Sequence, residues 1–252
     1  MTIPSLAQTL QRLALTLTVK DLMIPTERLT CSGREKDAPT MSAGNPDFNV
    51  IPIKKRGGQI TGYYERDSGL TKPIMANDLI SDGTSILALL GILEKRPFCF
   101  VLAHAQIAGY VHFSDLNHPF VKLALYTIIE AMESSALAMI SSVLDDQNLS
   151  RLGLGRRRLT KIKRRSERAQ KKNANRSWAD FLNIEDILRI AVRENKIYLN
   201  EQEIKAITGM RNKVSHQGTP LVQDHKGAIE IARIAGRCVQ LLHAESPCPA
   251  RR

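Results

Sequence analysis

The sequence is poor in aromatic residues and in cysteine. Aromatic residues make up 5% of its 252 residues and hydrophobic residues 43%, so any core must be largely aliphatic. The four cysteines form no C-x-x-C pair, and histidines are not interleaved with them at the spacing of zinc ligands. They are Cys31, Cys99, Cys238 and Cys248. We therefore expect no metal site, and we expect reduced thiols in the cytoplasm.

The sequence also lacks a long uninterrupted hydrophobic run. No segment approaches the ~18 consecutive apolar residues that a membrane-spanning helix needs, which predicts no membrane partner. Residues 1–22 lack a basic start and Arg12 interrupts their apolar residues, so we expect a short amphipathic helix rather than a signal peptide. A chain of 252 residues has room for two modest domains, each with its own core.

Positive charge is abundant, and it is concentrated in one segment. Residues 151–176 contain twelve Lys/Arg and a single acid, Glu167, so their net charge equals the +11 of the whole chain. Such a block attracts polyanions, of which nucleic acid is the commonest in a cytoplasm. Six of its cations are predicted RNA contacts: Arg156, Arg157, Arg158, Lys161, Arg164 and Arg165. The alternative is a solvated, partly disordered loop that serves solubility.

Strand and helix patterns alternate in the first half of the chain. Short apolar runs at 48–53 and 60–64 are joined by the turn residues "KKRGGQ", and runs at 98–102 and 107–111 are joined by "AHAQ", which predicts two hairpins. A helix is predicted over 82–95, where a Ser/Thr/Asp cluster precedes a helical stripe. The stripe consists of Ile86, Leu89, Leu90 and Leu93. The order strand, helix, strand, strand, helix repeats weakly.

This order resembles a tandem pair of CBS domains, the β-α-β-β-α modules named after cystathionine β-synthase. The second repeat covers 78–116 and ends in the pattern G-h-h-T-x-x-D, here Gly109 to Asp115. The first repeat is suggested by 19–25 and 48–68, and it departs from the family between them, where Pro39, Gly44 and Pro46 stand in place of a full helix.

The resemblance implies an adenine nucleotide as a regulatory ligand. It assigns Asp115 to the ribose and places His112 at the Thr/Ser position near the phosphates. In the first repeat the equivalent positions are Glu65 and Ser68, so the acidic ribose ligand is missing there. Two alternatives remain open: the pair is a scaffold or dimerisation platform without ligand, or Asp115 only caps the helix that begins near Leu116.

From Pro119 onward the sequence is helical. A long helix without a breaker is predicted from Pro119 to Asp145, followed after the basic segment by helices over 177–195, 200–216 and 224–244. Asn200 and Glu203 have the spacing of a capping box. Four such helices predict an antiparallel bundle.

The penultimate helix ends in Arg211-Asn212-x-x-x-His216, with Gly218 and Pro220 beyond it. A long first helix, a bundle and this motif resemble the HEPN domain (higher eukaryotes and prokaryotes nucleotide-binding), whose motif is R-x(4–6)-H. On an ideal helix the Arg and His side chains would stand about 140° apart, so they converge only if the helix ends near His216. Gly218 and Pro220 predict such an ending.

The motif predicts RNA cleavage without a metal or other catalytic cofactor. A permanently charged arginine suits the charge that builds on a phosphate, and a histidine that titrates near neutrality can move a proton of the ribose 2′-hydroxyl. Attack by that hydroxyl leaves a 2′,3′-cyclic phosphate. The resemblance implies that Arg211 and His216 are catalytic, that Asn212 orients the phosphate or braces the histidine, and that a homodimer forms the site.

The sequence thus predicts an α+β CBS-like regulatory domain over 1–117 (β-α-β-β-α repeats), followed by an all-α HEPN-like ribonuclease bundle over 118–252. Together they suggest a nucleotide-regulated endoribonuclease of a toxin or defence system. The leading alternative is a non-catalytic, nucleotide-responsive RNA-binding or toxin-neutralising module. A third is a bundle modified by a nucleotidyltransferase partner at Tyr126 or Tyr198. A further alternative is a bundle without catalysis, in which Arg211 caps helix carbonyls and His216 is an ordinary helix-terminal residue.

Overall fold

The computed structural model describes residues 5–45, 48–55, 57–144, 153–172, 178–216 and 218–244. The chain folds into two compact units, which are described separately. The α+β unit contains residues 15–121 and 222–229, and the helical unit contains the described residues of 1–14, 122–221 and 230–252. The N-terminal half is therefore α+β and the C-terminal region helical, but the chain passes between the units more than once. The sequence patterns predict a single boundary after residue 117.

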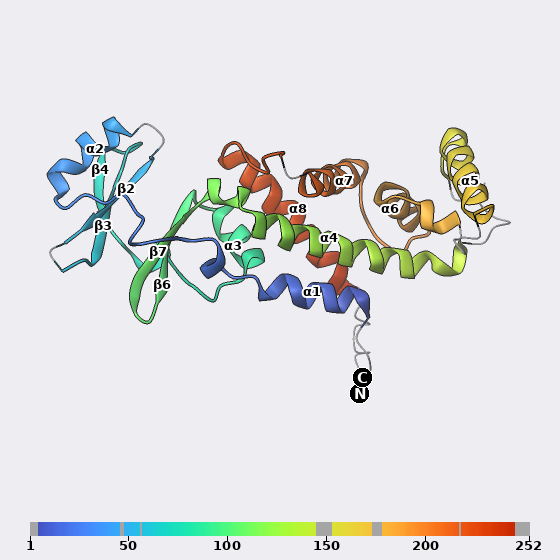
Figure 1. The fold of residues 1–252 in the computed structure, drawn as a ribbon, viewed down its shortest axis with the longest axis horizontal. Helices are drawn as coiled ribbons and strands as arrows, with labels where there is room; N and C mark the ends of the chain where they lie inside the picture. Colours follow the sequence, from blue (N-terminus) through green and yellow to red (C-terminus); the bar gives the residue numbers. More distant parts are fainter. Residues whose placement is uncertain are drawn as a thin grey trace. The chain divides into compact units, whose positions relative to one another are not determined.

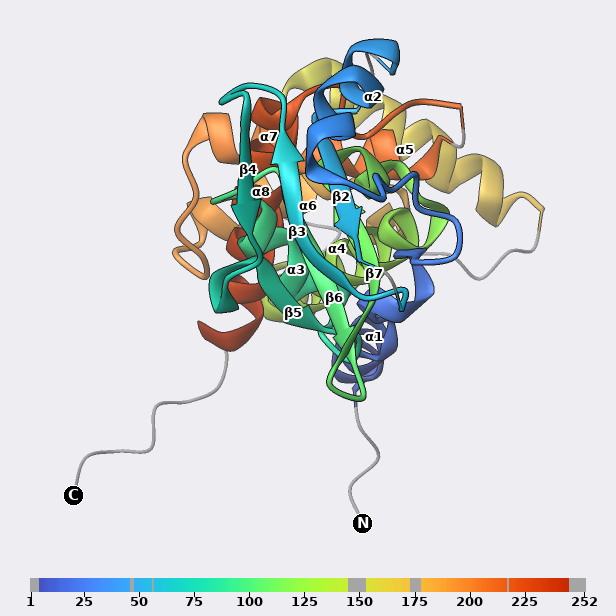
Figure 2. The same cartoon turned by 90° about the vertical axis from the view of Figure 1, so that its left-hand side faces the viewer.

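The α+β unit contains two sheets (Figure 2). One has the strand order β1-β7-β6-β5 and the other the order β2-β3-β4. The strands are β1 (Ile24–Pro25), β2 (Val50–Lys54), β3 (Ile60–Glu65), β4 (Leu70–Pro73), β5 (Leu79–Ser81), β6 (Phe98–Ala103) and β7 (Gln106–His112), and the helices are α2 (Ala38–Gly44) and α3 (Ile86–Leu93). All pairs are antiparallel except β5 with β6.

Both predicted hairpins are confirmed. The β6–β7 connection is a two-residue loop in which His104 and Ala105 have φ values of 48° and 63°, the left-handed conformation that tight hairpin loops need. The β2–β3 connection uses Gly57 and Gly58, also at positive φ, and the pairing register shifts between Ile53 and Lys54. These glycines permit a conformation that strains other residues.

The helix predicted in the second repeat is confirmed as α3. The Ser85 hydroxyl accepts a hydrogen bond from the Ala88 N–H at 3.2 Å and caps the first turn. All four residues of the predicted stripe are at most 1% exposed. Burial of this stripe is the main contribution of α3 to the core, at roughly 1.5–3 kcal/mol for each fully buried side chain.

The first repeat differs from the second in two places. Where Pro39 and Gly44 argue against a full helix, the chain forms only the seven-residue α2. After β3, a turn at Gly69, whose φ is +67°, returns the chain as β4, so a third antiparallel strand stands where the module has a helix. The weak repetition of strand, helix, strand, strand is present, but the closing helix of the first repeat is absent.

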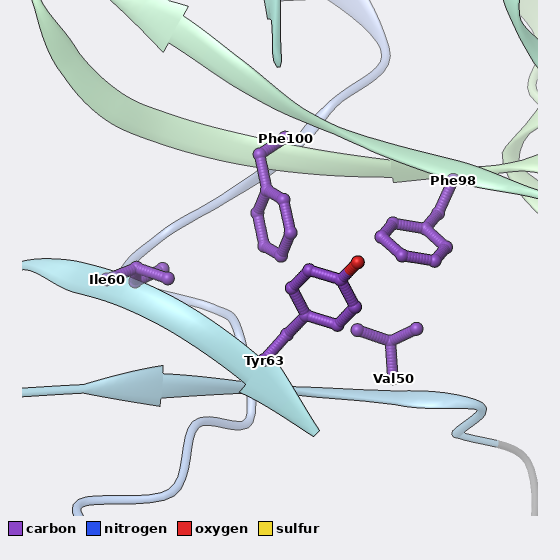
Figure 3. Packing of buried hydrophobic residues seen from close by; sticks show 5 residues of the cluster. All are labelled: Val50, Ile60, Tyr63, Phe98 and Phe100. Atoms are coloured by element: carbon purple, nitrogen blue, oxygen red, sulfur yellow. The ribbon is translucent and has the colours of Figure 1, made fainter. Parts of the chain in front are cut away.

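An aromatic cluster joins the two sheets of this unit. Figure 3 shows Tyr63 of β3 between Phe98 and Phe100 of β6, with Val50 and Ile60 beside it. The Tyr63 ring centroid lies 5.2 Å from that of Phe98 and 5.7 Å from that of Phe100. The Tyr63–Phe98 pair is edge-to-face and the Tyr63–Phe100 pair is tilted. Aromatic pairs contribute about 0.5–1.5 kcal/mol beyond their area burial. Although aromatics are scarce in the sequence, they are concentrated in this core.

In the described part of the helical unit there are six α-helices, which Figure 1 labels along the chain. They are α1 (Leu6–Thr16), α4 (Pro119–Ile140), α5 (Arg156–Gln170), α6 (Ile184–Arg193), α7 (Glu201–Ser215) and α8 (His225–Ala244). The four helices predicted after Pro119 correspond to α4, α6, α7 and α8. The amphipathic helix predicted near the N-terminus is α1, and its residues 6–14 belong to this unit.

Helix α4 is the central apolar helix of this unit. Together with the following turn, Pro119–Val143 is long and apolar enough to cross a membrane by length and composition, yet 56% of its most apolar window is buried inside the protein. Among its fully buried side chains are Leu125, Ile128 and Ile129. Burial of this kind is typical of the core helix of a bundle.

Helix α5 was not predicted. It occupies most of the basic segment, for which the alternative to nucleic-acid binding was a partly disordered loop. The helix forms because Arg, Lys and Gln are good helix formers and because Leu159 and Ile162 supply one apolar side for packing. It packs against the short 3-10 helix Trp178–Phe181.

Candidate functional site

The α+β unit contains a cleft of about 290 Å³ beside β7. Its walls come from the segment after β1, the segment before β2, the end of β7 and the turn Phe113–Asn117 that follows it. The polar and aromatic residues lining it are Arg28, Thr30, Phe48, Asn49, Tyr110, His112, Ser114 and Asp115. The structure therefore brings both sequence-predicted nucleotide-binding residues, His112 and Asp115, into one cleft.

Asp115 lines this cleft and also caps the turn that carries it. Its Oδ2 accepts a hydrogen bond from the backbone N–H of His112 at 2.8 Å. Burial raises the pKa of the Asp115 carboxyl, and the bond from His112 partly offsets that effect. Asp115 therefore does have a capping role, but not the predicted one: the 3-10 helix begins at Phe113 with His112 as its N-cap, and Asp115 completes the capping box from inside the helix. Among the described residues, Oδ1 has no hydrogen-bond partner.

His112 lines the cleft without offering it a free hydrogen-bonding atom. Its Nδ1 lies 2.9 Å from the Ser114 hydroxyl and 3.4 Å from the Ser114 N–H, while Nε2 is buried with no partner among the described residues. Burial, with a smaller effect from His225, lowers the pKa of His112 to about 4, so the ring is neutral at pH 7. The phosphate role that the resemblance implies for this position therefore does not fit the ring, because a neutral imidazole with no accessible donor cannot bind an anion.

The sequence motifs singled out His112 and Asp115 alone and missed the other residues of the cleft, among them Ser114, Tyr110, Arg28 and Phe48. Ser114 lies within the G-h-h-T-x-x-D pattern, but it was not singled out because the family uses the residue two positions earlier. Tyr110 is also in that pattern and is read there as a hydrophobic strand residue. Arg28 and Phe48 come from the irregular first repeat, where no motif marks them. The Phe48 side chain is 39% exposed, which is unusual for a phenylalanine. This exposure is visible only in the structure.

The equivalent positions of the first repeat lie outside the residues that line the cleft. The Glu65 carboxylate binds Lys72 and accepts a hydrogen bond from the Ser68 hydroxyl at 2.8 Å. Lys72 and Ser68 together lower the pKa of Glu65. This pair braces the β3–β4 turn, and the missing ribose ligand of the first repeat is not replaced by either residue.

In the helical unit, α7 ends just before His216, close to where Gly218 and Pro220 predict an ending. The predicted capping box is confirmed at its start, where Asn200 and Glu203 exchange hydrogen bonds of 2.9 and 2.8 Å. The last helical residue is Ser215, and His216 follows in an extended conformation with φ −107° and ψ 114°. Asn212 and His216 are exposed, and Arg211 is half-buried.

Contacts from α4 hold the loop after α7. The Lys122 ammonium donates hydrogen bonds to the carbonyl oxygens of His216 at 3.2 Å and Thr219 at 2.7 Å. The Thr219 N–H also donates to the His216 carbonyl at 3.4 Å. His216 is therefore held by its backbone while its side chain stays at the surface.

One carboxylate of α4, that of Glu133, lies close to Arg211. Burial, together with neighbouring Glu130, raises the pKa of Glu133, while the nearby Arg211 guanidinium lowers it. The Glu133 Oε2 and the Arg211 Nε are both buried without a hydrogen-bond partner in the part of the chain that the structure describes. Carboxylates on an amphipathic helix are usually exposed to solvent. The structure instead places Glu133, half-buried, within electrostatic reach of Arg211.

The predicted RNA-binding residues separate into two groups. Five are exposed on α5, whereas Arg158 binds the carboxylate of Asp186 and donates to the carbonyl of Phe181 at 3.1 Å. The side chains of Arg158 and Asp186 are 23% and 8% exposed. Arg158 is thus a correction to the prediction: its guanidinium is already satisfied inside the protein. Arg151 and Arg176 of the basic segment lie outside the described residues.

The structure also describes the two candidate modification sites and the residue types that bind metals. Tyr126 and Tyr198, the candidate modification sites, are 38% and 79% exposed. Among the described residues, no group of three or more His, Cys, Asp or Glu is placed to hold a metal ion.

No family model matches the sequence, and no curated protein sequence is significantly similar to it. Part of the chain is similar to solved CBS-domain structures. One is the CBS domain of a bacterial CNNM/CorC family Mg²⁺ transporter in complex with ATP, with 14% identity over 46% of this chain and 92% of that chain and a TM-score of 0.35. Another is a hemolysin-like protein containing a CBS domain from Oenococcus oeni PSU, with 11% identity over 43% of this chain and 93% of that chain and a TM-score of 0.34. With these low TM-scores, the function proposed below is based on the residues of this chain.

Proposed function

We propose that the α+β unit binds an adenine nucleotide in the cleft beside β7. The supporting observation is that Asp115, Phe48 and Arg28 come from three separate segments and line one cleft. The volume of about 290 Å³ is at the lower end of small-molecule sites, so a base and ribose fit inside and the phosphates extend outward. In this proposal the Asp115 Oδ1 accepts a hydrogen bond from a ribose hydroxyl. Phe48 stacks on the base, and the exposed Arg28 pairs with phosphate.

The test is calorimetric titration of the protein with AMP, ATP and GTP. We expect saturable binding of the adenine nucleotides, weakened about tenfold or more by Phe48→Ala and by Arg28→Ala, because each removes about 1–2 kcal/mol of stacking or charge-assisted contact. Leu70→Ala is the matched control for Phe48, since Leu70 is an exposed apolar residue of β4 outside the cleft. Lys36→Ala is the control for Arg28.

Two results would reject this site. One is the absence of saturable binding to wild type at millimolar nucleotide. The other is binding that Phe48→Ala and Arg28→Ala leave at wild-type strength. The second result would place a nucleotide site elsewhere and leave the cleft to a scaffold role.

We propose, as a second function, that the helical unit cleaves RNA without a metal. What supports it is the end of α7 at Ser215, because an uninterrupted helix would hold Arg211 and His216 apart. Arg211 would stabilise charge on the phosphate while His216 moves the proton of the attacking 2′-hydroxyl, and Asn212 would orient the phosphate. The bond from phosphorus to the 5′-oxygen breaks and the proton taken up by His216 passes to that oxygen, leaving a cyclic phosphate and a 5′-hydroxyl. The homodimer implied by the HEPN resemblance belongs to this proposal.

Cleavage is tested with purified protein and a mixed RNA pool in excess EDTA, with and without adenine nucleotides. His216→Ala should lower the rate about 10²–10⁴-fold, the usual contribution of a general acid or base. Arg211→Lys should also be strongly impaired, because it keeps the charge but loses the planar fork. His243→Ala, an exposed histidine on α8, should cleave like wild type.

Wild-type product that ends in a 2′,3′-cyclic phosphate would identify the reaction. Equal activity in wild type and His216→Ala would point to a contaminating nuclease. Absence of product under every condition would favour the non-catalytic RNA-binding or toxin-neutralising module. A change in rate on adding nucleotide would establish regulation, which we include in the proposal.

A further inference from the structure

Helix α5 exposes an unusually dense set of cations. Nine of them are exposed between the start of α5 and the turn after it. They are Arg156, Arg157, Lys161, Lys163, Arg164, Arg165, Arg168, Lys171 and Lys172. Among the described residues, none of these nine has an ion-pair partner, whereas Arg158 does. The positive charge of the chain is therefore neutralised at one position of α5 and left available at the others.

The helix is anchored by its opposite side. Ile162 and Ser166 are buried, and the Arg158 Nε donates to Asp186 Oδ2 at 2.8 Å and to Oδ1 at 3.1 Å. The Asp186 side chain is itself held in place, because its Oδ2 accepts a hydrogen bond from the Asn183 N–H at 3.0 Å in the capping box of α6. The exposed cations thus stand on a helix of fixed orientation, which lowers the conformational entropy lost when a ligand binds.

Four of the exposed cations form a straight row. Arg157, Lys161, Arg164 and Arg168 are spaced by four, three and four residues, which places them within about 60° on the helix surface, opposite Ile162 and Ser166. The row extends over three turns, about 16 Å. Successive cations are about 5–6 Å apart, comparable to the separation of neighbouring phosphates on a nucleic-acid strand.

The composition of α5 distinguishes between polyanionic partners. A helix that inserts into an anionic membrane needs an exposed apolar face. On α5 the only large apolar side chains are Leu159 and Ile162, and they lie on the anchored side, half-buried and buried. The helix also has no aromatic residue on which a base could stack. These features favour a nucleic-acid backbone, bound through its phosphates.

We propose that α5 binds the phosphate backbone of a nucleic acid through the row Arg157, Lys161, Arg164 and Arg168, without reading base sequence. This binding requires neither nucleotide in the cleft nor cleavage of RNA, so it stands or falls separately from the functions proposed above. RNA and DNA share the recognised group, and the experiment distinguishes them. If the helical unit does cleave RNA, α5 is the surface that captures the substrate.

The salt dependence of binding provides the quantitative test. Each phosphate contact changes the slope of log K against log salt by about 0.7 for single strands and about 0.9 for duplex DNA. The four-residue row should therefore contribute about 3–4 to that slope. The experiment measures fluorescence anisotropy of labelled single-stranded RNA, duplex RNA and duplex DNA of unrelated sequences, from 50 to about 300 mM salt.

The variant replaces all four residues of the row with Gln, which keeps helix propensity. We expect affinity to fall more than tenfold at low salt and the slope to fall by about 3–4. The control replaces four exposed lysines outside α5 with Gln, namely Lys36, Lys95, Lys196 and Lys205, and so makes the same change in net charge. It should stay within about threefold of wild type with an unchanged slope. Replacing Arg157, Arg164 and Arg168 with Lys should preserve binding, because Lys binds phosphate as a point charge.

Several outcomes would overturn the proposal. Equal losses in the row variant and the control would show that net charge alone drives binding. Failure of wild type to bind any of the three nucleic acids would remove the site. Binding to phosphatidylserine vesicles without binding to nucleic acid would assign α5 to a membrane surface. The relative affinities for RNA and DNA identify the polynucleotide preferred.

Discussion

Neighbouring arginines of one helix have opposite environments. Arg157 is exposed, while Arg158 binds Asp186 inside the helical unit. The two residues are chemically identical and adjacent, so only the packing of α5 separates them. A buried ion pair of this kind adds little net stability when formed, but the loss of one partner is costly because a charge is left uncompensated.

At this residue scale we predict that Arg158→Met lowers the free energy of unfolding of the helical unit by about 3 kcal/mol. Arg157→Met is the matched control and should change it by no more than about 0.5 kcal/mol, because an exposed cation has no partner to lose. The measurement is urea unfolding followed by circular dichroism. Combining Arg158→Met with Asp186→Asn should cost less than the sum of the single changes. Additive losses would mean that the pair is not coupled.

Among the elements, β7 is the one on which the cleft depends most. It carries Tyr110 and His112, and it pairs with β1, whose Ile24 also lines the cleft. The close approach of the two strands requires a glycine at position 109, since an added Cβ would lie 2.8 Å from the Ile24 carbonyl oxygen and 2.7 Å from Met23 Sδ.

We therefore predict that Gly109→Ala destabilises the α+β unit by about 1–3 kcal/mol through overpacking and weakens nucleotide binding in the same protein. Gly91→Ala in α3 is the control, because nothing lies within 4 Å of its added Cβ. That change should be neutral or stabilise by up to about 1 kcal/mol, since alanine is the better helix former. Thermal unfolding and nucleotide titration of both variants measure the effect. Retention of wild-type stability and affinity by Gly109→Ala would show that β1 can move away from β7 without cost.

At the scale of the whole molecule, stability depends on pH through His112. The buried ring has its pKa lowered to about 4, with His225 as the facing titratable neighbour, while the unfolded chain keeps a value near 6.5. Between these values the unfolded state binds more protons than the folded state, so stability rises with pH. The contribution is fully present above about pH 6.5 and is lost progressively down to about pH 4.

We predict that wild type loses about 2 kcal/mol of unfolding free energy through His112 when the pH falls from 7 to 5. Over the same pH interval, the loss of unfolding free energy in His112→Gln should be smaller than in wild type by about 2 kcal/mol, because glutamine does not titrate. Urea unfolding of both proteins at pH 7 and pH 5 measures the difference. Burial raises the pKa of Asp115, so the effect of Asp115 on the pH dependence of stability has the opposite sign to that of His112. The reason is that the folded state binds the Asp115 proton more tightly than the unfolded state. Parallel pH profiles in the two proteins would show that His112 is accessible to protons in the folded state.

Local pattern was sufficient to predict most elements. The hairpins at 48–64 and 98–111, helix α3 with its stripe and the capping box of α7 follow from alternation, helical spacing and turn residues, all of which act over a few positions. The order of strands within the sheets and the return of the chain as β4 were not predicted, because strand pairing depends on contacts distant in sequence. The same reason explains why Arg28 and Phe48 were missed in the cleft.

The sequence by itself determined where the positive charge lies, where α7 stops and which repeat carries an acidic residue at its end, since each is a property of consecutive residues. Only the tertiary structure decided what those residues face. It paired Arg158 with Asp186 while leaving Arg157 exposed, buried the His112 Nε2 without a partner among the described residues, and set Glu133 near Arg211. Burial and long-range partners are created when separate elements pack, and no local pattern specifies them.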